Sequence, residues 1–184
     1  MRKTVLRSFR LEKEVDEILQ KESQSRGISV NALVSQILKK FVEWDRYVER
    51  FGFVRIMRDG FRILHEELKE EEIEKLARDI GGRNPREAML FWFKSANTEN
   101  LLKWLSLHCK YGRIAEFEIQ RLGNCYTITL HHFLGKKYSL FLANWLDEAF
   151  RSVGEASSRY EVNRDSVVFT LETKNQREIH YNEV

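Results

Sequence analysis

The N-terminal fifty residues constrain the fold most, because their pattern predicts a unit too small to bury a core alone. Residues 4–11 alternate in a way typical of a short strand, and an acidic start at Glu12 leads into a helix-period segment that ends near Gly27. A second helical segment follows from about Val30 to Arg50. One short strand and two helices cannot exclude water from an apolar core. Two copies can, if the strands pair and the helices interlock, so the pattern predicts a dimer.

The details of this segment support the same reading. Alternation places Ser8 and Arg10 on one face of the strand and Phe9 and Leu11 on the other, which we expect to pack on the helices. Gly27 stands where a left-handed cap would end the first helix, and Ser29 is a good N-cap for the second. The apolar positions expected to form the core and the dimer interface are Val15, Ile18, Leu19, Ala32, Leu33, Ile37, Leu38, Phe41, Trp44, Tyr47, Val48 and Phe51.

Taken in order, these features resemble the ribbon-helix-helix family of DNA-binding repressors. The resemblance covers residues from about Lys3 to Trp44 and is carried by Ser8-Phe9-Arg10-Leu11, by Val15 with Ile18 and Leu19, and by Gly27-x-Ser29-x-Asn31 with Ala32-Leu33-Val34. It implies a homodimer or higher homo-oligomer whose paired strands enter the major groove of double-stranded DNA. By the same resemblance, Ser8 and Arg10 read base edges, and Ser29, Val30 and Asn31 hold a phosphate at the start of the second helix. Strand alternation places Arg7 on the same face as Phe9 and Leu11, and we expect it to reach a phosphate from the start of the strand.

The charge distribution favours a phosphate-rich partner for this segment. Residues 1–50 hold eleven Lys/Arg and eight Asp/Glu, whereas the remaining residues hold twenty of each. Basic side chains that neutralise phosphates supply most of the non-specific affinity for DNA. A hydrophobic fraction of 42% with 32% charged residues is typical of a folded globular chain. We expect a cytoplasmic protein with no membrane span.

The pattern of residues 52–173 predicts a second domain of the α+β class, and residues 174–184 are expected to form a polar tail. We expect a strand at 53–57, helices at about 59–68, 70–80, 86–94 and 98–110, and a helix at 135–152. Gly81-Gly82 would end one helix, Asn84-Pro85 would start the next, and Thr98 would cap the fourth. Alternation on both sides of Gly123-Asn124 predicts a β-hairpin, and further strands are expected at 158–162 and 166–172. Helices should cover one face of this small antiparallel sheet.

No catalytic or metal constellation emerges from the polar residues, so we expect no enzyme activity and no cofactor. Nickel-responsive repressors join a ribbon-helix-helix unit to a sensing domain and need a His-x-His pair, but His131 and His132 are adjacent and point to opposite faces of a strand. His132 shares the apolar face, which leaves His131 and Cys125 as the best candidates for metal ligands. The aromatic residues that we expect in the core, or around a small-molecule pocket, are Phe91, Trp92, Phe93, Trp104, Tyr138, Phe141 and Trp145.

These observations favour a dimeric, sequence-specific transcriptional regulator, with a second domain that senses a small-molecule effector or extends the oligomer. Two other hypotheses stay open. An antitoxin-like protein would bind DNA and mask a protein partner, although a folded second domain argues against it. A ligand-binding module or enzyme could use the N-terminal unit only to dimerise, and its DNA binding would then be neither salt-sensitive nor sequence-selective.

Overall fold

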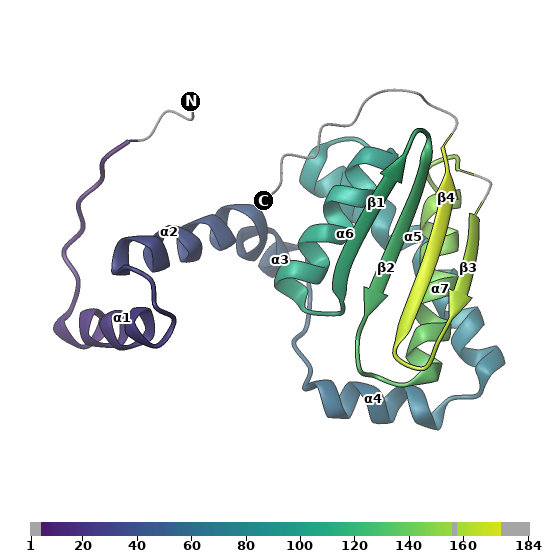
Figure 1. Ribbon diagram of the computed structural model, residues 1–184, viewed down its shortest axis with the longest axis horizontal. Helices are drawn as coiled ribbons and strands as arrows, with labels where there is room; N and C mark the ends of the chain where they lie inside the picture. Colours follow the sequence, from purple (N-terminus) through teal and green to yellow (C-terminus); the bar gives the residue numbers. More distant parts are fainter. Residues whose placement is uncertain (1–4, 156–157, 174–184) are drawn as a thin grey trace. The chain divides into compact units, whose positions relative to one another are not determined.

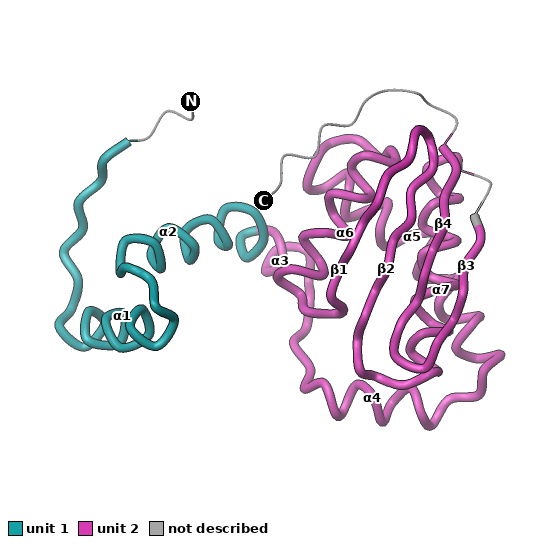
Figure 2. Tube along the Cα trace, in the orientation of Figure 1, with its two compact units in different colours: residues 1–46 teal, residues 47–184 magenta. Residues whose placement is uncertain are grey.

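The chain divides into two compact units, which meet at Arg46–Tyr47 (Figure 2). The computed structural model describes residues 5–155 and 158–173. The expected boundary lay slightly later, near residue 51. Tyr47 and Phe51 belong to the second unit because their rings pack against Trp92, with centroid distances of 5.0 and 5.5 Å. The polar tail expected at 174–184 lies outside the described residues.

The first unit consists of two helices joined by a tight turn (Figure 1). Helix α1 spans Lys13–Ser25, and α2 spans Val30–Lys40. The helical backbone then continues through a π-helical segment, η1 (Phe41–Asp45), into α3 (Arg46–Phe51), which agrees with the single long helix expected from about 30 to 50. Both predicted caps are confirmed: Gly27 is left-handed, with φ +63°, and the Ser29 hydroxyl oxygen accepts from the Ala32 N–H at 3.1 Å.

The strand expected at 4–11 is not formed within this single chain. Residues 5–12 have no regular secondary structure, and Thr4 lies outside the described residues. A strand exists only where its backbone groups pair with a neighbour, and among the described residues this segment has none. Two helices are therefore present where the prediction placed them, but the ribbon, and with it a ribbon-helix-helix unit, is not shown.

The second unit contains four further helices, α4 (Arg58–Glu67), α5 (Glu70–Phe93), α6 (Thr98–Gly112) and α7 (Lys136–Arg151). The strand predicted at 53–57 is wrong, because these residues are irregular and pair with no strand. The predicted cap at Thr98 is also wrong. Asn97 caps α6 instead, and its side-chain oxygen accepts from the Asn100 N–H at 2.9 Å.

Helix α5 overturns the prediction of two separate helices at 70–80 and 86–94. It runs through Gly81-Gly82 and through Pro85 without a break. Gly81 is buried where α5 lies closest to α7: a Cβ atom at this position would be 2.6 Å from the Trp145 carbonyl oxygen. The glycine therefore permits close helix packing and does not end the helix. Pro85 removes one backbone donor and crowds the Gly81 carbonyl one turn earlier, and burial of this part of α5, including Pro85 itself, offsets that cost.

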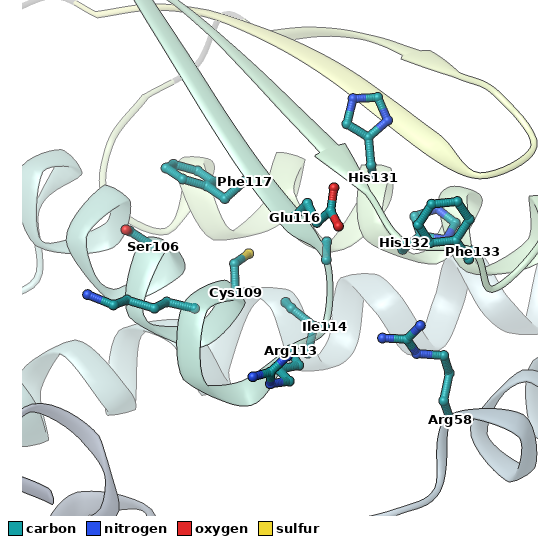
Figure 3. A pocket seen from close by; sticks show the side chains of 12 residues that line it. Arg58, Ser106, Cys109, Arg113, Ile114, Glu116, Phe117, His131, His132 and Phe133 are labelled. Atoms are coloured by element: carbon teal, nitrogen blue, oxygen red, sulfur yellow. The ribbon is translucent and has the colours of Figure 1, made fainter. Parts of the chain in front are cut away.

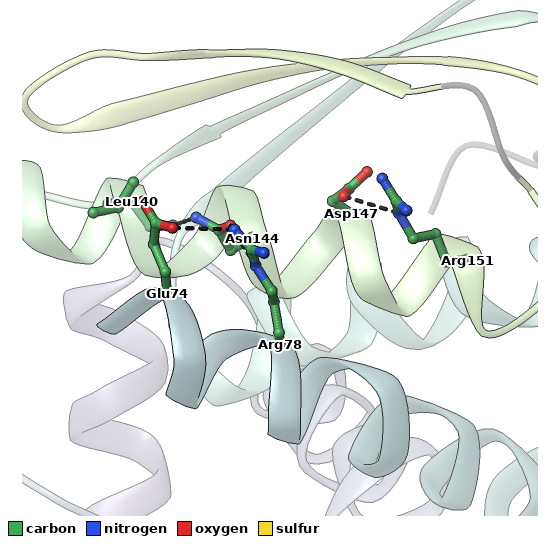
Figure 4. Close-up of polar contacts among 6 residues, drawn as sticks. All are labelled: Glu74, Arg78, Leu140, Asn144, Asp147 and Arg151. Carbon is green, nitrogen blue, oxygen red and sulfur yellow. Dashed lines mark hydrogen bonds and ion pairs between the residues drawn. The ribbon is translucent and has the colours of Figure 1, made fainter. Parts of the chain in front are cut away.

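A polar network also joins α5 to α7 (Figure 4). The Arg78 guanidinium donates to the Asn144 side-chain oxygen at 3.2 and 3.1 Å and to Glu74 at 3.0 Å. The Asn144 amide donates in turn to the Leu140 carbonyl at 2.9 Å. Asn144 is buried, and this network satisfies its side chain on both ends.

The sheet confirms the predicted hairpin and the two later strands. It contains β1 (Glu116–Leu122), β2 (Cys125–His131), β3 (Ser158–Val162) and β4 (Ser166–Glu172), all antiparallel, in the order β1-β2-β4-β3. In the register Ile128 lies opposite both Ile119 and Phe169, so apolar side chains of three strands share one face.

Helices α6 and α7 pack on the apolar face of the sheet, which confirms the α+β class for this unit (Figure 1). Helix α7 contacts both the sheet and α5, so it forms the middle layer of the unit. The core is continuous through these layers, with Leu102, Tyr126, Leu146 and Phe169 almost fully buried. Threonines of β2 and β4 make much of the other face and remain half-exposed. Within residues 5–155 and 158–173, no helix has the length and apolar character of a membrane span.

Candidate nucleic-acid interface

The three residues of the N-terminal segment predicted to contact DNA, two of them at base edges and Arg7 at a phosphate, are all exposed. Arg7, Ser8 and Arg10 lie in the irregular stretch before α1 and contact solvent. Neither arginine has an ion-pair partner among the described residues, in contrast to Arg26, whose guanidinium pairs with Glu22 on α1. Both guanidinium groups are therefore available for bidentate bonds to a phosphate or to a guanine edge.

The start of α2 brings the other three predicted residues together. Ser29 and Asn31 are exposed and Val30 is half-buried. The Ser29 side chain satisfies the Ala32 N–H, and the Ser29 carbonyl accepts from the Leu33 N–H at 3.0 Å. The Val30 and Asn31 N–H groups have no acceptor among the described residues. They lie at the positive end of the helix dipole, where a phosphate oxygen would satisfy them.

Most large apolar side chains of the first unit are exposed, although Leu33 and Trp44 are buried. Phe9 is 66% exposed, Ile18 65% and Phe41 51%. The other large apolar side chains of this unit that are exposed are Val5, Leu6, Leu11, Val15, Ile37, Leu38 and Val42. On α1, only Ser23 is buried, and on α2 only Leu33. The predicted stripe is thus present along both helices, but this chain does not cover it.

The second unit holds two cavities that sequence patterns did not locate. An aromatic cavity of about 200 Å³ is lined chiefly by Phe51, Phe53, Phe61, Trp104, Phe141 and Trp145. Three of these belong to the predicted aromatic cluster. The remaining three come from α3, α4 and the irregular segment between them, which no local pattern connected to the cluster. The buried Trp104 indole N–H has no hydrogen-bond partner within the described residues. The aromatic side chains that make up most of this lining suit an apolar molecule.

The second cavity, of about 420 Å³, has a mixed polar and apolar lining and is shown in Figure 3. We call it the cationic pocket, because Arg58, Lys110 and Arg113 line it together with the single carboxylate Glu116. Arg58 comes from α4, whereas Lys110 and Arg113 come from the end of α6. Because these segments are far apart in the chain, no sequence motif marks the pocket.

The best predicted metal ligands do not converge. His131 and Cys125 stand at opposite ends of β2, and six strand residues span about 20 Å. No group of three or more His, Cys, Asp and Glu side chains among the described residues is arranged to hold a metal ion. Cys109 is buried, and burial raises the pKa of its thiol to about 12. That thiol is therefore protonated at neutral pH and is a poor nucleophile or ligand.

His132 and Ser139 lie in hydrogen-bond contact, but their roles exclude a nucleophile–base pair. The Leu134 N–H donates to His132 Nδ1 at 3.0 Å, so the proton of the neutral ring is on Nε2. Nε2 then donates to the Ser139 Oγ at 2.8 Å, and the Ser139 hydroxyl donates to the Arg164 carbonyl at 3.2 Å. The serine proton thus points away from the imidazole. Burial lowers the His132 pKa to about 4, which keeps the ring neutral. As the sequence predicted, His132 belongs to the buried face.

Comparison with known proteins adds no assignment to this geometry. No family model matches the sequence, and no curated protein is significantly similar to it.

Proposed function

We propose that the protein is a dimeric, sequence-specific DNA-binding transcriptional regulator that acts through its first unit. One observation carries the proposal. The first unit exposes most of its large apolar side chains, and the segment before α1 carries two arginines without partners among the described residues. Contiguous apolar surface of this kind marks an interaction site, and a second copy with the same stripe is a self-complementary partner.

In the proposed dimer, residues 5–11 of two chains pair as an antiparallel ribbon. Phe9 and Leu11 turn inward onto the helices, and their present exposure is lost. Ser8 and Arg10 then share the outer face, since strand side chains alternate. A two-stranded ribbon fits the major groove, where Arg10 would bond a guanine and Ser8 a base edge.

The start of α2 would fix the position of the ribbon on the duplex. The Val30 and Asn31 N–H groups are suited to one phosphate in each half-site, and Arg7 to another. Phosphate contacts set register and orientation, while base contacts set sequence preference. A two-fold dimer would read a palindromic or near-palindromic site.

The second unit would supply regulation. It has its own core and encloses two cavities, and neither cavity uses a residue assigned here to DNA. In this scheme an effector bound to the second unit changes the DNA affinity of the first. The protein would act in the cytoplasm.

Selection of binding sites from random double-stranded DNA by the purified full-length protein tests the proposal. We expect enrichment of one palindromic sequence, with affinity that falls as salt is raised. A protein that enriches no sequence, or binds DNA without salt dependence, would contradict the proposal and favour a unit that only dimerises.

The Arg10→Ala variant tests whether Arg10 contacts a base edge. Loss of one good base contact removes about 1–3 kcal/mol of discrimination, so the variant should lose preference for the selected site and keep most of its affinity for random DNA. Lys21→Ala, which also removes one exposed cation of the first unit, is the matched control and should keep the preference. An Arg10→Ala protein with unchanged preference would make Arg10 a phosphate contact at most.

A further inference from the structure

The cationic pocket lies where α6, β1 and the turn after β2 come together (Figure 3). Its apolar lining includes Cys109, Ile114, Phe117 and Phe133. Phe133 is 66% exposed. The pocket is of ordinary size for a site that holds a small organic molecule.

The charges in the pocket are unbalanced. Arg58, Lys110 and Arg113 form no ion pair with any described residue, although the Lys110 ammonium lies 5.1 Å from the centroid of the Tyr111 ring, outside the pocket lining. Glu116 is the single carboxylate in the lining, and it lies opposite His131 in the β1–β2 register. Figure 3 shows its carboxylate near that histidine, on the sheet side of the pocket. Three cations on the helix side are thus left without a counter-charge.

Helix electrostatics account for two of these cations but not for the third. Lys110 and Arg113 stand at the C-terminal end of α6, where the helix dipole favours positive charge. Arg58 is the first residue of α4, where the same dipole disfavours a cation. In Figure 3 its guanidinium extends toward the turn that carries Arg113 and Ile114. Its position adds to the positive potential of the pocket at a cost to its own helix.

Backbone conformation gives a second, independent observation. Among the described residues, only three non-glycine positions are left-handed, and two of them, Arg113 (φ 55°) and Phe133 (φ 61°), line this pocket. A glycine would end α6 without the steric cost that an arginine has in this conformation. Such outliers cluster at binding sites, where a side chain is needed in spite of the strain.

We propose that the cationic pocket binds a small organic anion with two or more negative charges, held by Arg58, Lys110 and Arg113 and packed against the rings of Phe117 and Phe133. Planar guanidinium groups bind phosphate and carboxylate oxygens in a bidentate manner, so a phosphorylated molecule and a polycarboxylate share the required chemistry. The inference goes beyond the proposed DNA binding and shares no residue with it. Either proposal therefore stands if the other fails.

Calorimetric titration of the full-length protein without DNA tests the site, with pyrophosphate and citrate as separate probes at constant ionic strength. We expect saturable binding of at least one of them, and the better probe indicates whether the ligand is a phosphate or a carboxylate. Arg58→Gln and Arg113→Gln should each weaken it about tenfold or more, since hydrogen bonds to charged groups are the strong ones. Arg86→Gln, an exposed arginine on α5 outside the pocket, is the matched control and should bind as the native protein does.

Thermal melting of each variant shows that it is folded, and Lys110→Gln provides a third change if one arginine variant fails to fold. Binding of neither anion at millimolar concentration would overturn the proposal. Equal weakening by Arg86→Gln would also overturn it, because it would indicate general charge attraction. A DNA affinity that falls in Arg58→Gln, with no binding of either anion, would assign these cations to the DNA backbone instead.

Discussion

Gly81 of α5 faces the backbone of Trp145 on α7 so closely that no side chain fits between the two helices. A Cβ atom on Gly81 would lie 2.6 Å from the Trp145 carbonyl oxygen and 3.1 Å from its Cα. Both of these atoms belong to the backbone, so neither can move aside by a change of rotamer. This contact determines how closely α5 packs onto the middle layer of the second unit.

Gly81→Ala should therefore destabilise the protein, by about 1–3 kcal/mol, as overpacked cores do. Gly82→Ala is the matched control. Its Cβ would be 3.4 Å from the Glu148 Cγ, a side-chain atom that can move, and alanine is favoured over glycine inside a helix by about 0.5–1 kcal/mol. Urea unfolding should thus show opposite signs for the two variants. Equal stability of both would show that the helices separate at no cost.

Ile37→Asp should convert a dimer to a monomer. Ile37 is 49% exposed in the single chain, and substitution of such a residue on a monomer changes stability by only about 0.5 kcal/mol. In the proposed dimer the same side chain is buried, so a carboxylate there would be desolvated without a partner. Sedimentation velocity should show the loss of the dimer in Ile37→Asp and not in Gln36→Asp, its exposed neighbour. A dimer that survives Ile37→Asp and Ile18→Asp together would rule out this interface.

Acid should weaken the second unit through His108 and His132. Burial lowers the pKa of both His108 and His132 to about 4, from 6.5. Because the folded state holds these rings neutral, it binds fewer protons than the unfolded state between these values, and stability falls as the pH drops from about 6.5 toward 4. Each histidine accounts for up to about 2 kcal/mol between pH 6.5 and 5.

Urea unfolding at pH 7 and pH 5 measures this dependence. The double variant His108→Gln, His132→Gln should lose most of the difference between the two conditions. Ser139→Ala removes a contact of His132 but keeps both rings, so it should lower stability at both pH values and preserve the difference. The histidine assignment is wrong if the double variant retains the full pH dependence.

Arg113→Gly should stabilise the fold and weaken anion binding as Arg113→Gln does. A left-handed arginine costs about 1 kcal/mol that glycine avoids, less the entropy that glycine gains on unfolding. Lys94→Gly is the matched control, because Lys94 is also left-handed, with φ 63°, at the end of α5, and it does not line the cationic pocket. Both variants should melt higher, but only Arg113→Gly should bind pyrophosphate or citrate more weakly than the native protein. Weaker binding in both variants, or in neither, would contradict the role of Arg113.

Local sequence chemistry predicted much of the secondary structure. The Gly27 and Ser29 caps, the hairpin about Gly123-Asn124 and the helix at 136–151 follow from residues adjacent in the chain, so their signals are complete within a short window. The burial of His132 followed in the same way, from strand alternation. The order of the sheet strands had no such signal, because pairing between β2 and β4 joins segments forty residues apart.

Tertiary structure decided the features whose partners are distant. Gly81-Gly82 signalled a helix end, but burial against Trp145 keeps α5 continuous, since packing energy outweighs local preference. Arg58 and Arg113 line the same pocket only because the fold brings α4 and the end of α6 together. The sequence by itself determined which segments are amphipathic and where helices begin, because those properties depend on near neighbours. Only the tertiary structure decided which faces meet, because burial depends on every element that covers a residue.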